Sequence, residues 1–257
     1  MDLPRNAFKQ ALREGRPLAG TWFMSASPAI AEALGCCGFD FLVLDMEHTT
    51  VDVSVLMPLL QAVAGTPAAS VVRLPWNDPV VVKRVLDSGA QTLMVPFVQN
   101  VAEARAAVAS TRYPPHGVRG VAAMHRASRY GAVKDYLLEA ADEICVILQL
   151  ETLAAVEALP EIAAVEGVDC LFVGPADLSA SMGLLGQIGH PDVQRALHGA
   201  AEAAARIGKP VGIVAPTPEM ARRFLDYGYS WSAVSSDLAM VTARARELVG
   251  LVRESRA

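Results

Sequence analysis

Long hydrophobic runs are absent from this chain of 257 residues. Asp, Glu, Arg or Gly interrupts every apolar stretch before it reaches the roughly 18–20 residues that cross a bilayer. Residues 1–17 are charged throughout and contain no apolar signal core, so we predict a short helix there and a cytoplasmic protein. A basic surplus is also absent, because the formal net charge is −5. The sequence therefore predicts no membrane partner and no nucleic-acid partner.

Cysteine is scarce, with four residues and no CxxC pair. Cys36 and Cys37 are adjacent and cannot easily bridge each other, while Cys145 and Cys170 lie in apolar runs. We interpret all of them as buried, reduced thiols with a structural role rather than a metal or redox role. No GxSxG, phosphate-loop or GxGxxG motif occurs. The chain is instead rich in apolar residues, at 53%, which favours a large core and a subunit interface.

Short apolar runs alternate with segments of helical period along the whole chain, the pattern of a parallel sheet with crossover helices. The expected strands are 18–24, 39–45, 70–73, 91–96, 144–151, 168–174, 210–214 and 230–235. The expected helices after them are 27–37, 53–63, 79–89, 101–111, 153–159, 190–207, 217–227 and 238–253. This series predicts an α/β fold, a single (β/α)₈ TIM barrel over residues 1–257. Residues 112–143 are expected to form an inserted loop and helix over the rim.

Carboxylates follow two of the predicted strands. Glu151 ends the run CVILQLE, and Asp177 follows CLFV in the segment GPADLS. Both would lie at the carboxyl end of the barrel, which carries the chemistry in this fold. Gln149, two residues before Glu151, would share its face of the strand. Oxygen ligands suit Mg²⁺ or Mn²⁺, with Co²⁺ also plausible, so we predict a divalent metal at Glu151 and Asp177. The alternative for Glu151 is a cap on the following helix.

His48 and Arg73 lie at the ends of two earlier predicted strands. Asp45, three residues before His48, could accept from one imidazole nitrogen and leave the other to move protons. The alternative is that Glu47 and His48 begin a solvated loop. Arg73 ends an apolar strand, where its guanidinium needs an anion, either a bound oxo acid or an internal carboxylate. These groups together predict a metal-assisted lyase or hydrolase.

A Schiff-base mechanism is disfavoured by the positions of the lysines. They occur only at Lys9, Lys83, Lys134 and Lys209, and none lies in the C-terminal half of a predicted strand. A lysine that attacks a carbonyl inside a barrel must be carried by a strand.

Six segments together resemble the metal-dependent (class II), pyruvate-type 2-keto acid aldolases, a family that includes 4-hydroxy-2-oxoheptanedioate aldolase and 2-keto-3-deoxyglucarate aldolase. The segments are LDMEH, VVRLPWNDPVVVKRVLDSGAQTLMVPFV, TRYPPHGVRGV, LQLET, GVDCLFVGPADLS and GHPDVQ. The resemblance spans about residues 7–253. It implies retro-aldol cleavage of a 4-hydroxy-2-oxo acid to pyruvate and an aldehyde, through an enolate stabilised by the metal and Arg73.

The resemblance also implies roles for residues. Glu151 and Asp177 match the metal ligands, His48 with Asp45 the acid/base centre, and Arg73 the oxyanion-stabilising residue. Three further groups match the positions that hold pyruvate: Gln149 and the amides of Ala176 and Asp177. Trp22 and Val214 match positions that shape the aldehyde pocket, and Asp87 matches an aspartate that reaches a neighbouring subunit's site. The family's last helix is swapped between subunits, usually in a hexamer, so we expect a homohexamer.

Departures from the family pattern limit what is implied about the substrate. This chain has HTTVD where family members more often have HAPND. It has Ser235, Ser236 and Asp237 where the usual family sequence is GVD or GSD. The segment PWNDP and the fourth predicted strand resemble the heptanedioate enzymes, whereas MHRAS, GKPVGIVAP and AVSSD resemble the deoxyglucarate enzymes. The resemblance therefore supports the reaction class better than the substrate. Two alternatives stay open: a lyase of the citrate-lyase or malyl-CoA type, and a non-catalytic barrel that binds an oxo acid.

Overall fold

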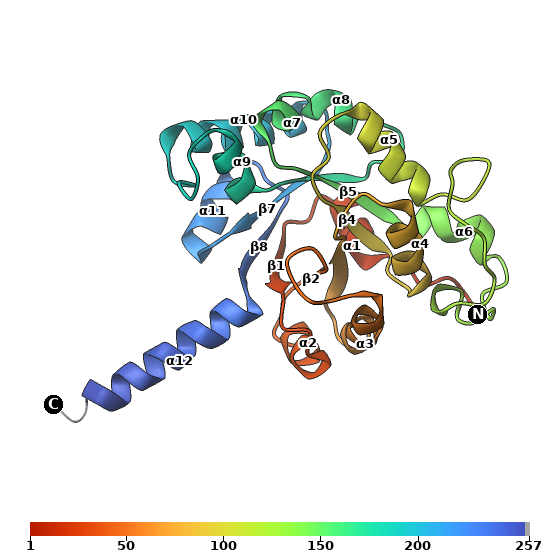
Figure 1. The fold of residues 1–257 in the computed structure, drawn as a ribbon, viewed down its shortest axis with the longest axis horizontal. Helices are drawn as coiled ribbons and strands as arrows, with labels where there is room; N and C mark the ends of the chain where they lie inside the picture. The colour runs from red at the N-terminus through yellow and green to blue at the C-terminus, as the bar shows by residue number, and fades with distance from the viewer. Residues whose placement is uncertain (255–257) are drawn as a thin grey trace.

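Eight parallel strands close into a barrel in the order in which they occur along the chain (Figure 1). The computed structural model describes residues 1–254. The strands are β1 (Leu18–Phe23), β2 (Phe41–Asp45), β3 (Ala69–Arg73), β4 (Thr92–Val95), β5 (Cys145–Leu150), β6 (Cys170–Val173), β7 (Val211–Ala215) and β8 (Trp231–Ser236). The predicted TIM barrel is confirmed, and each predicted strand agrees with an observed one to within two residues at either end.

Helices cover the outside of the barrel, and most begin with a side-chain cap. Asp52, Asp78, Asn100 and Thr217 each accept a backbone N–H in the first turn of the helix that follows. The helices are α1 (Ala7–Arg13), α2 (Pro28–Gly35), α3 (Val53–Val63), α4 (Pro79–Asp87), α5 (Val101–Ser110), η1 (Arg126–Ser128), α6 (Tyr136–Glu143), α7 (Leu153–Glu157), α8 (Leu159–Ala163), α9 (Pro175–Ser181), α10 (Pro191–Arg206), α11 (Pro218–Asp226) and α12 (Asp237–Glu254). Within residues 1–254 no helix is long and apolar enough to cross a membrane.

The short helix α1, predicted from the charged start of the chain, closes the amino end of the barrel. Phe8 is 2% exposed and packs edge-on against Phe41 and Trp231, with ring centroids 5.3 Å away in each case. Lys9 Nζ donates to the carbonyl of Ile144 at 2.7 Å, which ties the helix to the start of β5. Aromatic residues thus fill the amino end of the barrel interior, and the carboxyl end of the strands is the end that carries the active site in this fold.

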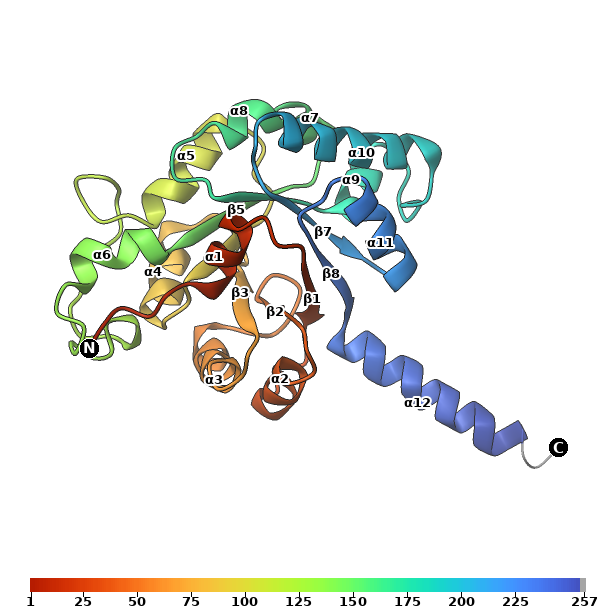
Figure 2. The same ribbon diagram turned by 180° about the vertical axis from the view of Figure 1, so that it is seen from behind.

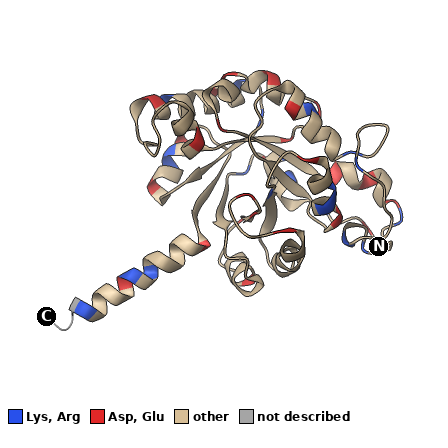
Figure 3. Ribbon diagram, viewed as in Figure 1, with Lys and Arg blue, Asp and Glu red and all other residues tan. Residues whose placement is uncertain are grey.

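The last helix, α12, projects away from the barrel (Figures 1 and 2). It contacts β1 and β8, and its first residue, Asp237, accepts the backbone N–H groups of Met24 and Ser25. Val241, Leu248 and Leu251 are each between 47% and 57% exposed, although Lys/Arg and Asp/Glu lie between them (Figure 3). The helix therefore presents apolar side chains that the barrel does not cover.

Two expectations from the sequence are wrong. The segment 112–143 does not cover the rim; it lies at the amino end of the strands, where Arg5 bonds Glu143 Oε1 at 2.7 Å. A helix that precedes a strand must end at that strand's amino end, so α6 has no route to the rim. Of the four free cysteines, Cys36 and Cys37 are exposed rather than buried, and they come directly after the end of α2.

Candidate active site at the carboxyl end of the barrel

A buried ion pair joins the ends of β2 and β3. Asp45 and Arg73 are register partners at the last position of each strand. Both oxygens of the Asp45 carboxylate accept from Arg73, from Nε and from Nη2, at 2.8 Å each. Asp45 is fully buried and Arg73 is 7% exposed, so this bidentate pair has little competition from water. Of the two anions considered for Arg73, the internal carboxylate is the one that the structure provides.

Glu47 lies in the site, although the sequence indicated no role for it beyond the alternative of a solvated loop start. Its side chain is only 16% exposed, and its Oε2 lies 2.8 Å from Arg73 Nη1. Arg73 thus carries a carboxylate on each side. The available signal was the spacing in LDMEH, which places one carboxylate at the last residue of a strand and a second two residues later.

The expected contact between Asp45 and His48 is wrong. Arg73 occupies both oxygens of Asp45, and the nearest acid to His48 is Glu47, with Nε2 and Oε2 3.9 Å apart. The His48 side chain is 62% exposed. The imidazole therefore stands at the solvent edge of the site, where it can meet a substrate entering from above the barrel.

Glu151 comes directly after β5 and turns into the site. Its Oε2 accepts the backbone N–H of Phe97 at 3.0 Å, and its Oε1 accepts from Gln149 Nε2. Gln149 and Glu151 therefore share one face, as their spacing predicts. Phe97 has a φ of 54°, a left-handed conformation that is uncommon outside glycine and concentrated at functional sites. The helix α7 is capped by Thr152, which accepts from Ala155 N, so Glu151 is not needed as its cap.

Asp177 lies in the first turn of α9, which begins immediately after β6. Ala176 and Asp177 are exposed, and they follow the carboxyl end of β6. Gly174 precedes this turn, and a Cβ at that position would lie 2.8 Å from Glu151 Oε1. The absence of a side chain at Gly174 therefore makes room for the Glu151 carboxylate.

The electrostatics of the site show an excess of negative charge. The pKa of Glu151 is raised to about 7, first by burial and then by the charges of Glu47 and Asp177. The pKa of Glu47 is also raised, because burial outweighs the opposing effect of Arg73. Gln149 Oε1 is buried with no hydrogen-bond partner among residues 1–254. A divalent cation suits a place where carboxylates converge and a buried oxygen lacks a donor.

No cluster of three or more His, Cys, Asp and Glu ligands is arranged around one metal position within residues 1–254. The predicted pair of Glu151 and Asp177 is smaller than such a cluster. It would leave coordination positions open for a substrate and water.

Aromatic and aliphatic side chains form the rest of the rim near Arg73. The Trp22 ring lies under the Arg73 guanidinium, 4.7 Å from Cζ to the ring centroid, and 5.7 Å from the Phe172 ring. Val214 on β7 is part of the same apolar cluster as Trp22. Trp22 thus fixes one face of the guanidinium while carboxylates hold its edges.

Asp87 lies elsewhere, as its helix position predicts. It ends α4, and its Oδ1 accepts from Arg119 Nη2 at 2.7 Å. His125 Nε2 is 3.7 Å from the same oxygen. A helix that follows a barrel strand ends near the amino end of the sheet, so Asp87 does not join Glu151 and Arg73 within one chain.

The fold and site together define a TIM-barrel enzyme with a carboxylate-rich rim, an arginine and a histidine. A model of the HpcH/HpaI aldolase/citrate lyase family matches residues 18–243, so the chain belongs to that family. It is 51% identical to a 2-dehydro-3,6-dideoxy-6-sulfogluconate aldolase of Pseudomonas putida over 92% of both chains. It is 46% identical to a 5-keto-4-deoxy-D-glucarate aldolase of Shigella boydii over 95% of both.

A solved structure supports the same assignment. A HpcH/HpaI aldolase/citrate lyase family protein from Burkholderia cenocepacia superposes with a TM-score of 0.94 at 43% identity, over 96% of this chain and 99% of the other. The prediction of an aldolase, a carbon–carbon lyase, is confirmed by these relatives.

Gly174→Ala is expected to lower activity on the order of 10²-fold with the fold intact, because the new Cβ must displace the Glu151 carboxylate and small misplacements in an active site are costly. Steady-state kinetics and thermal unfolding would measure this. Gly199→Ala is the matched control: nothing lies within 4 Å of a Cβ there, in the middle of α10, so activity should be unchanged. Equal activities of the two variants would contradict the packing argument.

Proposed function

We propose that this aldolase cleaves a 4-hydroxy-2-oxo acid derived from a sugar acid into pyruvate and an aldehyde. The proposal is carried by the convergence of Glu151, Asp177 and Glu47 beside Arg73, a charge arrangement suited to a cation and a 2-oxo acid. Two of the similar proteins act, by their names, on deoxy sugar acids that carry a second anionic group. We therefore propose a substrate of that class.

The proposed cofactor is Mg²⁺, Mn²⁺ or Co²⁺, with Glu151 and Asp177 as its protein ligands. When bound, it would supply Lewis-acid charge next to the oxygen atoms of the 2-oxo acid. Gln149 and the amides of Ala176 and Asp177 would orient the carboxylate of pyruvate, since the first turn of a helix offers unpaired N–H groups.

Different protein groups move the proton and stabilise the negative charge. His48, at the solvent edge of the site, takes the proton of the C4 hydroxyl, directly or through water. The C3–C4 bond breaks, the aldehyde leaves, and the electron pair moves onto the C2 oxygen to form an enolate. Arg73 faces the negative charge that develops there, held in place by Asp45. His48 returns the proton to C3, directly or through water, which completes pyruvate and restores the free imidazole.

The test is a panel of 4-hydroxy-2-oxo acids of increasing length, with pyruvate release coupled to lactate dehydrogenase. Cleavage of deoxy sugar acids that end in a carboxylate or a sulfonate is the expected result. A citrate-lyase or malyl-CoA type of reaction would instead require turnover of a CoA ester. A non-catalytic barrel that binds an oxo acid would bind pyruvate and release none.

We propose further that the enzyme is a homohexamer whose exposed helix α12 packs on a neighbouring subunit and whose Asp87 completes a neighbour's site. The exposed apolar side chains of α12 support its packing on a neighbouring subunit. The position of Asp87, away from its own chain's site, supports its role in a neighbour's site.

Complementation between variants is the prediction that tests shared sites. Asp87→Ala and His48→Ala should each be inactive alone, and reassembled mixtures should regain activity, because some sites then receive both intact residues. Mixed assemblies would be verified by mass spectrometry, and activity would be measured as pyruvate release. A fully active monomer by light scattering, or verified mixed assemblies without activity, would exclude shared sites.

A further inference from the structure

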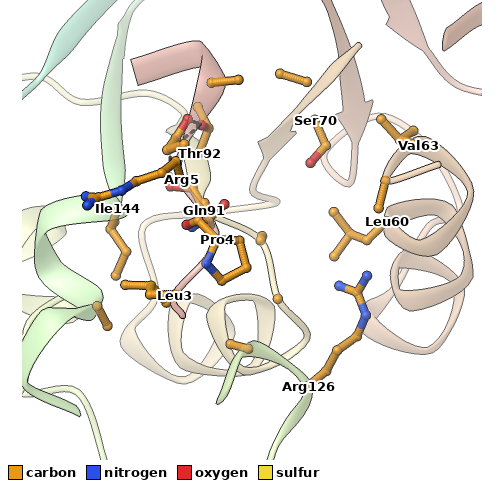
Figure 4. A pocket seen from close by; sticks show the side chains of 18 of the residues that line it. Leu3, Pro4, Arg5, Leu60, Val63, Ser70, Gln91, Thr92, Arg126 and Ile144 are labelled. Carbon is orange, nitrogen blue, oxygen red and sulfur yellow. Dashed lines mark hydrogen bonds between the residues drawn. The ribbon is translucent and has the colours of Figure 1, made fainter. Parts of the chain in front are cut away.

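A cavity of about 320 Å³ lies at the amino ends of β3, β4 and β5 (Figure 4). Its floor includes Ala69, Thr92 and Ile144, which begin or precede these strands, whereas Arg73 and Glu151 end or follow them. A strand of five residues spans roughly 16 Å. The cavity is therefore separate from the candidate active site.

The walls of the cavity are partly apolar and partly polar, the polar part including Asn6, Gln91 and Thr92. Leu60 and Val63 of α3 form one side, and Leu3, Pro4 and Ile144 form the other (Figure 4). Its size is at the lower end of the range of small-molecule pockets, which are commonly lined by apolar groups with a few polar ones.

The charge around the cavity is entirely positive. Among residues 1–254 no Asp or Glu lines it, whereas Arg5, Arg126 and Arg129 do, in a protein with a net charge of −5. Arg5 is paired with Glu143 at 2.7 Å. Arg126 and Arg129 form no ion pair within residues 1–254, and the pKa of Arg126 is lowered, first by burial and then by Arg129. The cavity thus holds a half-buried guanidinium without a counter-charge.

The Arg126 guanidinium is also held in a fixed place. Its Nη1 donates to the carbonyl of Ser88, just after the end of α4, at 2.8 Å. Gly89 has a φ of +97°, and a Cβ there would lie 2.4 Å from that nitrogen, so only glycine leaves room for it. One nitrogen is anchored, and the planar group can offer its other edge to an anion.

We propose that this cavity binds a small monocarboxylate with a short apolar chain, its carboxylate on Arg126 and its chain between α3 and the Leu3–Ile144 wall. A guanidinium matches a carboxylate with parallel N–H···O bonds, and the acid-free lining excludes cations. The apolar side chains of Leu60, Val63, Leu3 and Ile144 offer hydrophobic burial to the chain of such a ligand.

The experiment is calorimetric titration of the full-length protein with hexanoate and, separately, with its neutral analogue hexanamide. Hexanoate is expected to bind at least about tenfold more tightly than hexanamide, because only the anion pairs with the guanidinium. Arg126→Gln should remove that preference and keep a donor for the Ser88 carbonyl, while Glu151→Gln should bind hexanoate as the unmodified protein does. Leu60→Trp fills part of the cavity from the α3 side and should weaken the binding of both hexanoate and hexanamide.

Three results would overturn the proposal: no hexanoate binding, equal binding of the neutral analogue, or loss of binding in Glu151→Gln with Arg126→Gln unaffected. Thermal unfolding of each variant would show that it is folded. If Arg126→Gln does not fold, Leu60→Trp and the comparison of hexanoate with hexanamide decide the question.

Discussion

Excess EDTA is expected to reduce pyruvate release by a factor on the order of 10³ or more, and Mg²⁺, Mn²⁺ or Co²⁺ should restore it. The expectation follows from the carboxylates that converge at Glu151 with too little positive charge to balance them. A Lewis acid contributes several kcal/mol to such a reaction. Glu151→Gln should lose metal affinity in the same way while remaining folded, because the lesion lies at the rim of the barrel.

The raised pKa of Glu151 predicts how metal affinity and the stability of the metal-free protein change with pH. Metal binding needs the carboxylate, and that pKa is raised to about 7, so metal affinity should fall as the pH drops below 7. For the metal-free protein the folded state binds the extra proton, so stability should decrease as the pH rises from about 4.5 to 7. Metal titrations and thermal unfolding at several pH values measure both effects. Full activity in EDTA, or trapping of pyruvate by borohydride, would exclude the metal mechanism.

His48→Ala is expected to lower kcat for cleavage by about 10²–10⁴-fold, the usual contribution of a placed general acid/base. Pyruvate affinity should change much less, because the groups proposed to hold pyruvate lie on β3, β5 and α9. The two effects are separated by steady-state kinetics and by pyruvate titration. His198→Ala is a matched control, since His198 lies on α10 and pairs with Glu202 at 3.8 Å. A His48→Ala variant within a few-fold of the unmodified enzyme would remove this residue from the mechanism.

Periodicity and strand ends explain why so much of the architecture was predictable. Buried parallel strands are short and continuously apolar, and α3 was predicted with its observed bounds because Asp52 caps it and Val63 ends its apolar face. The placement of Glu151 and Asp177 after two neighbouring strands followed from the same pattern. The path of residues 112–143 was not predictable, since an irregular segment has no period and its contacts, such as Arg5 with Glu143, are far apart in sequence.

The sequence by itself determined the barrel, the end at which its polar residues gather, and a lack of strand lysines that disfavours a Schiff base. Tertiary structure alone decided how those residues pair. Asp45 is close to His48 in sequence, yet it binds Arg73, because β2 and β3 place Asp45 and Arg73 directly opposite each other. Glu47 also lies in the site, because its carboxylate pairs with Nη1 of Arg73, the part of the guanidinium that Asp45 leaves free. Charge pairing depends on distance in space, and strand register sets that distance.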